Sequence, residues 1–490
     1  MPHILHLNQH AAQNIHAHKL HITANILILQ EKQEYSHKNR MKQLVTSIII
    51  LCSCLAVQAQ DISAAMDSLL RDNLFASSDV SVAIYDLDDD RSIYSYRAAK
   101  MCRPASVLKL LTAGVALERL GIGHTINTTL CMEDSNLYLR GETDPLFSEA
   151  DLDAMAASIA SGITIDTLFA DCTFTDSIYW GPGWSWDDTP WEYQPYMSPL
   201  MLNGGCVDVC VKPSAQGSAP TVTCTPQSAY YTIVNEAVSH DAAKGKLTIM
   251  RDWLDNTNII RIRGNCTATT GERMNLLGSD RHFIATLCEK LAARGIEVRN
   301  VARSATPSTA DTLYICRRSI TDVIKEALEE SNNLCAEALI YHMGALYGHR
   351  PVSHKDGVNI VKGFVEYTLG IKGEYEIADG SGLSLYTYIS ADIMMQALRH
   401  IHSNKLIYST IETNLPLSGW TGTLKGRMAG TPAERKIRAK TGTVSGICTL
   451  AGYAKARNGH TLAFVIFNQG VMKPKLARRW QNKVCELLCR

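Results

Sequence analysis

The sequence predicts an α+β fold in which a strand-rich segment interrupts a domain of helices and strands. Three observations support this prediction. A hairpin pattern and an apolar helix occupy residues 80–120, and residues 121–312 change to short β-like runs with turn residues between them. Helical patterns return after 312 and the chain finishes with strands and a helix. We therefore expect residues 60–120 and 313–490 to form one domain and residues 121–312 to be a β-rich insertion.

The composition is that of a globular protein with more than one domain. Of the 490 residues, 46% are hydrophobic and 20% are charged, which are ordinary fractions for a folded chain. The 48 basic and 48 acidic residues give a formal net charge of zero. A polyanion-binding surface is therefore not expected, and nucleic acid is excluded as a predicted partner.

The first 59 residues predict a leader and a cleavable signal. Residues 1–40 are polar, Met41-Lys42-Gln43 is positively charged, and an apolar run over 44–57 ends at Val57-Gln58-Ala59. This pattern is typical of a secretory signal over about 41–59, and its apolar run is too short for a membrane span. We expect a periplasmic protein with no stable membrane span after cleavage. The alternative is a lipoprotein, because Leu51-Cys52-Ser53-Cys54 loosely resembles a lipidation box.

The first ordered elements are a helix, a hairpin and a second helix. Residues 61–75 have a helical pattern, and residues 80–87 and 91–96 are predicted to form a hairpin across an acidic turn. The second helix is predicted over 105–120, with Pro104 in its first turn and Gly121 after its end. We expect the hairpin to begin a sheet on which this helix packs.

The remaining elements follow the same patterns. In the insertion, helices are predicted over 148–161 and 280–294, and strands over 164–169, 207–211, 221–224 and 258–264. Afterwards we expect helices over 320–330, 334–347 and 357–368, strands over 436–444, 449–455 and 461–467, and a last helix over 473–489. Asn458-Gly459 is a strong hairpin signal, and the single apolar stripe of the last helix indicates that it covers the sheet.

No metal or organic cofactor is expected. Cys206-x3-Cys210 and Cys485-x3-Cys489 have a possible ligand spacing, but no histidine or second pair lies nearby in sequence, which favours buried or disulfide-bonded cysteines. Thirteen of the fifteen cysteines follow the signal, so disulfides are permitted, with at least one thiol left over. The acidic turn after residue 86 resembles a calcium loop but has Arg91 where glycine is needed, which indicates a solvated turn.

Ser106 and Lys109 form the first candidate catalytic pair. They are three residues apart at a helix start, so both side chains lie on one face and the helix N–H groups point towards Ser106. Neighbouring leucines should desolvate Lys109 and lower the pKa of its amine, which then accepts the serine proton near neutral pH. Alone, this spacing is weak evidence, because serine and lysine often meet on a solvated helix face.

Two downstream motifs strengthen the interpretation. Ser331-Asn332-Asn333 and Lys440-Thr441-Gly442-Thr443 follow in the order found in penicillin-binding proteins and serine β-lactamases. Each has an ordinary structural explanation, a helix cap for the first and a strand end for the second. It is improbable that all three motifs occur in this order by chance. Together they predict acyl transfer at a serine.

The residues from about 80 to 468 resemble the penicillin-binding proteins of the DacB type, D-alanyl-D-alanine carboxypeptidases and endopeptidases of class C. Besides the three motifs, the resemblance includes Gly183-Trp184-Ser185-Trp186-Asp187-Asp188 and Ala378-Asp379-Gly380-Ser381-Gly382-Leu383-Ser384. Ser331 follows Ser106 by 225 positions, a separation that leaves room for the insertion. The resemblance implies a β-lactamase/transpeptidase-like domain, that is, a five-stranded antiparallel sheet flanked by helices plus a helical cluster, with a large β-rich insertion.

The resemblance also implies roles for individual residues in the cleavage of peptidoglycan stem peptides, with β-lactam antibiotics as inhibitors. Ser106 is the nucleophile, Lys109 its base, and Ser331 a proton relay between Lys109 and Lys440. Asn333 is expected to bind the substrate peptide, Thr441 and Thr443 its carboxylate, and Gly442 to leave room for the substrate along the strand. The N–H groups of Ser106 and Thr443 are the expected oxyanion hole. Asp187 and Trp184 are expected to contact the amine and the apolar part of the stem-peptide side chain.

Two departures from the family pattern and two alternative functions complete the prediction. Asn332 stands where aspartate is common, and should point away from the chemistry. Leu385 stands where relatives carry an arginine for the diaminopimelate carboxylate, so weaker recognition of that carboxylate is expected, unless Arg427 or Arg350 supplies it. The alternatives are a serine β-lactamase or esterase of the same fold, and a non-catalytic cell-wall binder.

Overall fold

The computed structural model describes residues 62–194 and 196–490. The chain divides into two compact units between Asp67 and Ser68, and the numbered elements below belong to the second. The predicted signal and the lipidation box lie outside the described residues. Residues 62–69 are helical and Asn73–Ala76 (η1) form a 3-10 turn, so the helix predicted over 61–75 is interrupted. Among the described residues, no helix has the length and apolarity to cross a membrane.

One five-stranded antiparallel sheet joins the beginning and the end of the chain, as predicted. Its strands, in the order β18-β19-β20-β1-β2, are Ile437–Val444, Gly446–Lys455, Thr461–Val471, Asp79–Asp86 and Arg91–Tyr96. The pairing of β1 with β20, Val82 opposite Ile466, brings the N-terminal hairpin beside the C-terminal strands. All four pairings are antiparallel.

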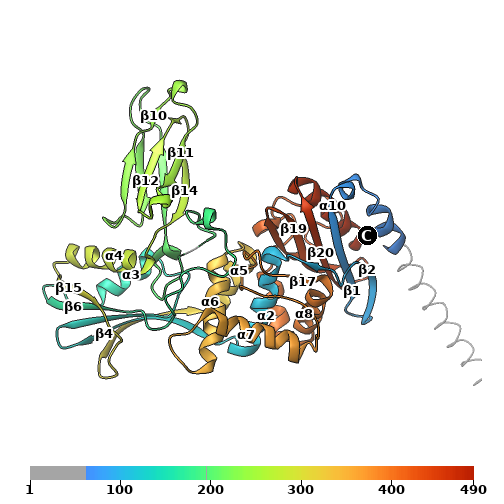
Figure 1. The fold of residues 1–490 in the computed structure, drawn as a ribbon, viewed down its shortest axis with the longest axis horizontal. Helices are drawn as coiled ribbons and strands as arrows, with labels where there is room; N and C mark the ends of the chain where they lie inside the picture. The colour runs from blue at the N-terminus through green and yellow to red at the C-terminus, as the bar shows by residue number, and fades with distance from the viewer. Residues whose placement is uncertain (1–61, 195) are drawn as a thin grey trace, which may run out of the picture. The chain divides into compact units, whose positions relative to one another are not determined.

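Helices cover both faces of this sheet. α8 (Ala391–Ser403) packs with Ala463, Val465 and Phe467 in one core cluster. α10 (Pro474–Leu488) packs with Cys448 in a separate cluster. Successive side chains of a strand point to opposite faces, so the odd-numbered positions of β19 and β20 in the first cluster face α8, and the even-numbered Cys448 faces α10. The predicted covering helix is confirmed; Figure 1 shows α8 and α10 beside the sheet.

α2 (Leu108–Leu120) lies at the centre of the helical cluster. Its residues from Leu108 to Leu117 are all buried, as expected of a helix that is apolar all round. The 3-10 turn η2 (Ala105–Val107) precedes it, so the predicted helix begins with a tighter turn. The helices packed around α2 are α5 (Ile320–Glu329), α6 (Asn333–Gly344), α7 (His354–Gly363), α8 and α9 (Lys405–Asn414). A π-helix η8 (Phe364–Thr368) follows α7, and β3 (Met101–Cys102) pairs with β17 (Ile389–Ser390).

A second five-stranded sheet lies between the two halves of the first in sequence. Its order is β15-β6-β5-β4-β16, with parallel pairs on the β15 side and antiparallel pairs on the β16 side. The strands are Glu297–Arg303, Thr164–Asp171, Asn136–Gly141, Thr125–Glu133 and Asp311–Ser319. α3 (Glu149–Ala157) and α4 (Ser279–Ala293) contribute to its core. β16 continues across residue 312, where the sequence pattern placed the end of the insertion.

Smaller sheets complete the strand-rich region, and the upper green lobe of Figure 1 contains several of their strands. β7 (Cys206–Lys212) pairs with β8 (Thr221–Thr225) and β14 (Thr270–Asn275), and β12 (Ile259–Arg263) with β11 (Thr248–Arg251) and β9 (Thr232–Asn235). β10 (Val238–Ser239) pairs with β13 (Asn265–Cys266). The strands share one core around Val209 and Ile260.

The cysteines of the two Cys-x3-Cys pairs are buried as predicted except Cys210, which is an exposed free thiol and contradicts the prediction, and the acidic turn is held by hydrogen bonds to its own Asp86. All thirteen cysteines from Cys102 onward are free thiols, and Cys210 is exposed whereas Cys206, Cys485 and Cys489 are buried. The Asp86 carboxylate accepts hydrogen bonds from the backbone N–H groups of residues 88 and 89 and contacts His460 Nδ1 at 2.9 Å. The turn is thus closed by its own side chain.

Candidate active site

Ser106 lies in a tight turn whose shape depends on its neighbours. Ala105 has a φ of 46°, a conformation that is uncommon for residues other than glycine. The turn is fixed from β19, where Thr449 Oγ1 donates to Pro104 O at 2.7 Å. Gly382 lies so close that a Cβ atom there would be 2.0 Å from Ala105 O. Such strained positions gather at functional sites, and here the strain sets the start of α2.

Lys109 lies one turn later, completely buried. Its Nζ is 3.0 Å from Ser106 Oγ, 2.6 Å from Asn333 Oδ1 and 2.9 Å from Ser381 O. Burial lowers the pKa of Lys109 to about 8, against the charges of Asp379 and Glu337, which raise it. The predicted contact and the predicted direction of the shift are both present.

The partners of Lys109 define how its neutral amine is oriented. A neutral amine has two N–H groups and one lone pair, and a carbonyl oxygen can only accept. The two N–H groups therefore point to Asn333 Oδ1 and Ser381 O, and the lone pair is left for the Ser106 hydroxyl. The assignment of Asn333 Oδ1 is fixed because its Nδ2 donates to Tyr193 O at 2.6 Å.

The three residues of the Ser331-Asn332-Asn333 motif have different positions. Asn332 is the N-cap of α6 and accepts from Cys335 N at 3.1 Å, so it points away from Lys109 as predicted. Ser331 has a φ of 67°. Within the described residues its hydroxyl makes no hydrogen bond, and it lines a cavity of about 530 Å³ together with Glu192, Tyr193, Arg273, Glu330 and Asn333.

The motif Lys440-Thr441-Gly442-Thr443 lies on β18, and this strand packs against η2. Lys440 is fully buried and donates to Thr441 O at 3.0 Å, and burial and the charge of Lys109 hold its pKa well below the usual range. A Cβ atom on Gly442 would be 2.2 Å from Thr449 Oγ1 and 3.0 Å from Ser106 N. A side chain at position 442 would therefore collide with Thr449 of β19 and approach η2 closely, so glycine permits this packing.

The two threonines of this motif have side-chain partners from other elements. Thr441 Oγ1 donates to Thr423 Oγ1 at 2.8 Å, and Arg478 of α10 donates to Thr443 Oγ1 at 3.3 Å. Thr443 is exposed and Thr441 half-buried. Arg478 is a neighbour of the motif that the sequence analysis did not identify, because it comes from the last helix.

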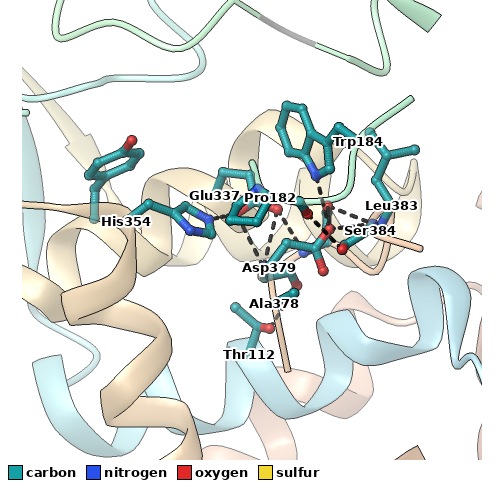
Figure 2. Close-up of polar contacts among 12 residues, drawn as sticks. Thr112, Pro182, Trp184, Glu337, His354, Ala378, Asp379, Leu383 and Ser384 are labelled. Atoms are coloured by element: carbon teal, nitrogen blue, oxygen red, sulfur yellow. Dashed lines mark hydrogen bonds and ion pairs between the residues drawn. The ribbon is translucent and has the colours of Figure 1, made fainter. Parts of the chain in front are cut away.

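Trp184 is hydrogen-bonded to the Asp379 loop through its indole nitrogen. Its Nε1 donates to Asp379 Oδ2 at 3.1 Å, and Figure 2 shows the indole above this carboxylate. Asp187 lies in the short turn η3 (Trp186–Asp188) and is exposed. The structure thus joins the segment around Trp184 to the Asp379 loop, two elements that the family resemblance named separately.

The Asp379–Ser384 loop contacts this segment at two further points. Ser384 Oγ donates to Pro182 O at 2.7 Å, and Leu385 N donates to Gly183 O at 3.1 Å. Arg350 and Arg427, the two residues that could supply the carboxylate contact in place of Leu385, have other partners. Arg350 contacts Glu142 Oε1 at 3.4 Å, and Arg427 donates to Asn482 Oδ1 of α10 at 2.7 Å.

The candidate site therefore combines a buried amine, a serine hydroxyl, a second buried lysine and a strand edge. The sequence identified these residues but missed Glu337 and the Ser381 and Tyr193 carbonyl groups, because backbone acceptors leave no mark in a motif. Glu337 was detectable by its spacing, since it follows Asn333 by four residues and so shares a helix face with it. The arrangement can activate a serine for attack on an acyl carbon.

Comparisons with known proteins agree with this chemistry. The family model described as D-Ala-D-Ala carboxypeptidase 3 (S13) matches residues 62–489. A D-alanyl-D-alanine carboxypeptidase of Actinomadura sp. (strain R39) is 30% identical over 445 residues, which are 84% of this chain and 81% of that protein. D-alanyl-D-alanine carboxypeptidase DacB of Haemophilus influenzae is 23% identical, over 82% of this chain and 87% of the relative.

Solved structures match the fold. Penicillin binding protein 4 (dacB) of Haemophilus influenzae superposes with a TM-score of 0.73 at 22% identity and covers 84% of this chain and 98% of its own. A predatory peptidoglycan endopeptidase of Bdellovibrio bacteriovorus gives a TM-score of 0.50 at 15% identity, over 84% of this chain and 92% of its own. The predicted fold class, a transpeptidase-like domain with a β-rich insertion, is confirmed.

Proposed function

Because the chain belongs to the D-Ala-D-Ala carboxypeptidase 3 (S13) family, we propose that it cleaves the terminal D-alanyl-D-alanine bond of peptidoglycan stem peptides through an acyl-enzyme on Ser106. The observation that carries the assignment is the fully buried Lys109 amine, 3.0 Å from Ser106 Oγ, with its pKa lowered to about 8. An amine with this pKa is partly neutral at pH 7 and can accept the serine proton.

In the acylation step, Ser106 Oγ attacks the carbonyl carbon of the penultimate D-alanine while its proton moves to Lys109 Nζ. The negative charge that develops on the carbonyl oxygen is stabilised by the N–H groups of Ser106 and Thr443. The proton then reaches the leaving amine by way of Ser331, as a relay between Lys109 and Lys440. Free D-alanine leaves, and water hydrolyses the ester on Ser106 in the second half of the cycle.

Substrate recognition uses the rim of the same site. Asn333 and the edge of β18 bind the peptide backbone, and the hydroxyls of Thr441 and Thr443 bind the terminal carboxylate. Trp184 and Asp187 face the stem-peptide side chain. The endopeptidase neighbour from Bdellovibrio supports a second activity on cross-links, where the leaving amine belongs to another stem peptide.

We retain two further proposals from the sequence. The division into residues 60–120, 121–312 and 313–490 is supported by the separate cores around Val107 and Leu139. Export to the periplasm behind a signal over about 41–59 is supported by the cell-wall substrate of this family's chemistry. N-terminal sequencing of the protein secreted from its own cell would identify the cleavage site.

Labelling with a fluorescent penicillin tests the nucleophile. Mass spectrometry of the labelled protein should show one adduct, on Ser106, and release of D-alanine from a stem pentapeptide should be measurable. Ser106→Ala should lose both, with a decrease in turnover of at least about 10⁴-fold, because removing a nucleophile leaves only the contribution of substrate binding.

Ser81 provides a matched control, since it is a fully buried serine in β1 outside the site. Ser81→Ala should label at the wild-type rate. Labelling that survives Ser106→Ala would contradict the assignment. Fast hydrolysis of penicillin by the wild type would favour a β-lactamase, and no D-alanine release under any condition would favour a non-catalytic binder.

A further inference from the structure

The Ser381–Gly382 peptide group connects Lys109 to a buried carboxylate. Its carbonyl accepts from Lys109 Nζ at 2.9 Å, and its N–H, on Gly382, donates to Asp379 Oδ1 at 3.1 Å. A peptide group is planar, so holding the N–H on one side fixes the direction of the carbonyl on the other. The orientation of Lys109 therefore depends on how this loop is held.

Glu337 holds the two preceding peptide groups of the same loop. Its Oε1 accepts from Ser381 N at 2.8 Å, and its two oxygens lie 3.2 and 3.1 Å from Gly380 N. Glu337 lies on α6 four residues after Asn333, and residues at this spacing share a helix face. Both acceptors of Lys109, Asn333 Oδ1 and Ser381 O, are therefore fixed by the same face of α6.

A buried ion pair keeps Glu337 charged. His354 Nε2 of α7 lies 2.8 Å from Glu337 Oε2, and Figure 2 shows the imidazole beside this carboxylate. Burial is the largest single effect and opposes charge on both groups, but the ion pair, the hydrogen bonds from the loop to Glu337 and the negative charges near His354 together exceed it, so the pKa of Glu337 is lowered and the pKa of His354 is raised. A charged carboxylate accepts backbone N–H bonds more strongly than a neutral group.

We propose that Glu337 is a positioning residue for Lys109, which holds the Ser381 carbonyl where it directs the lone pair of the amine to Ser106. The inference rests on the proposed function of Lys109 as the base. Neither the three sequence motifs nor the mechanism above assigns a role to Glu337. Its carboxylate acts through Ser381 and does not touch Ser106.

The charge of Glu337 gives the proposal a signature in the pH dependence of acylation. The negative charge of Glu337 raises the pKa of Lys109 against the effect of burial. Removing it should therefore lower the pKa of Lys109, so that the base becomes neutral at lower pH. The other ionisable groups that face Lys109 or this ion pair are Asp379, Cys335, Lys440, Tyr341 and Asp176.

The test compares Glu337→Ala with Glu337→Gln in single-turnover acylation by a fluorescent penicillin. Rates are expressed per labelled site, so that unfolded protein does not count. Glu337→Ala leaves the two loop N–H groups without their acceptor and should slow acylation about 100-fold, the effect expected for a small misplacement of a catalytic group. Glu337→Gln keeps an acceptor oxygen and should recover acylation to within about tenfold of wild type, with the rise of rate with pH moved to lower pH.

Asp86 supplies the matched control. It is also a buried carboxylate that accepts two backbone N–H groups and contacts a histidine, His460, but it lies in the β1–β2 turn. Asp86→Ala should keep the wild-type acylation rate per labelled site and the wild-type pH profile, whatever it loses in stability.

The outcomes separate this inference from the proposed function. A wild-type protein without a Ser106 adduct would overturn the proposed function and the inference with it. A wild type that labels on Ser106, together with a Glu337→Ala variant of unchanged rate, would overturn the inference alone. If Glu337→Ala does not fold, the pH profile of Glu337→Gln decides, and an unshifted profile at the wild-type rate would contradict a positioning role.

Discussion

The antiparallel sheet that contains β18 and the mixed sheet that contains β5 each have five strands, yet the regions around them use buried ionisable groups differently. Beside the first, Lys109, Glu337 and Asp379 are fully buried and each is hydrogen-bonded to another element. In α4, which packs on the second sheet, His282 is also fully buried, but neither ring nitrogen has a hydrogen-bond partner among residues 62–194 and 196–490. Burial alone lowers the pKa of His282 to about 4, so it remains a neutral, space-filling side chain.

This difference shows that burial of an ionisable group does not by itself mark a site. Perturbed pKa values indicate function when specific partners converge on one place. Lys109, Asn333 and Ser381 meet although 224 and 272 residues separate the lysine from the other two. The strand-rich region contributes mainly one side of the site. Its contacts are made by Tyr193 O, Gly183 O and the Trp184 indole.

Among the variants that test this difference between the two regions, Lys109→Met should have the largest effect on the acylation rate. It keeps the length of the side chain and removes the base. Acylation should fall about 10³-fold, within the range for loss of general base catalysis. In the wild type the neutral amine is the active form, and the pKa of Lys109 is about 8. The rate should therefore rise as pH increases through about 8 and level off above it.

The measurement is the pH profile of penicillin acylation from pH 6 to 10 for both proteins. The methionine variant should retain a small rate without the rise near pH 8. A wild-type profile that is flat across this range would contradict the assignment of Lys109 as the base.

An intermediate effect is expected where the two regions meet, at Leu385. Leu385 N bonds to Gly183 O beside Trp184, and a leucine cannot pair with a side-chain carboxylate of the stem peptide. A charge-assisted arginine contact is worth roughly 1.5 to 3 kcal/mol, so Leu385→Arg should raise the preference for the free acid over the amidated stem peptide by one to two orders of magnitude.

The readout is the ratio of kcat/KM for the two peptides, and Leu385→Met is the control of similar size without charge. An unchanged ratio in the arginine variant would show that position 385 does not reach this carboxylate. A strong preference for the free acid in the wild type would point to another residue.

The smallest effect on catalysis is expected at His282. His282→Phe keeps an aromatic ring and removes two buried nitrogens that have no hydrogen-bond partner in the described part of the chain, so the free energy of unfolding should increase by about 1 kcal/mol. Urea denaturation measures this change, and acylation per labelled site should stay at the wild-type rate. A loss of stability would show that the imidazole has a polar role in α4, and a slower acylation would remove the contrast between the two regions.

The sequence by itself determined the fold class and the local parts of the site. Turn residues between strand-like runs predicted the β1–β2 and β19–β20 hairpins, because an acidic turn and an Asn-Gly pair are properties of the local sequence. The three-residue spacing predicted the contact of Ser106 with Lys109, because residues three positions apart share one face of a helix. The apolar neighbours of Lys109 gave the correct direction of its pKa shift.

Only the tertiary structure decided which distant groups complete the site. Ser381 O accepts from Lys109 and Tyr193 O accepts from Asn333, and no local pattern connects these two backbone groups with α2 or α6. The close packing of Gly442 on Ser106 N likewise depends on how β18 lies along η2. The physical reason is that backbone acceptors are identical in every residue, so their directions are set by the packing of elements and not by the type of side chain.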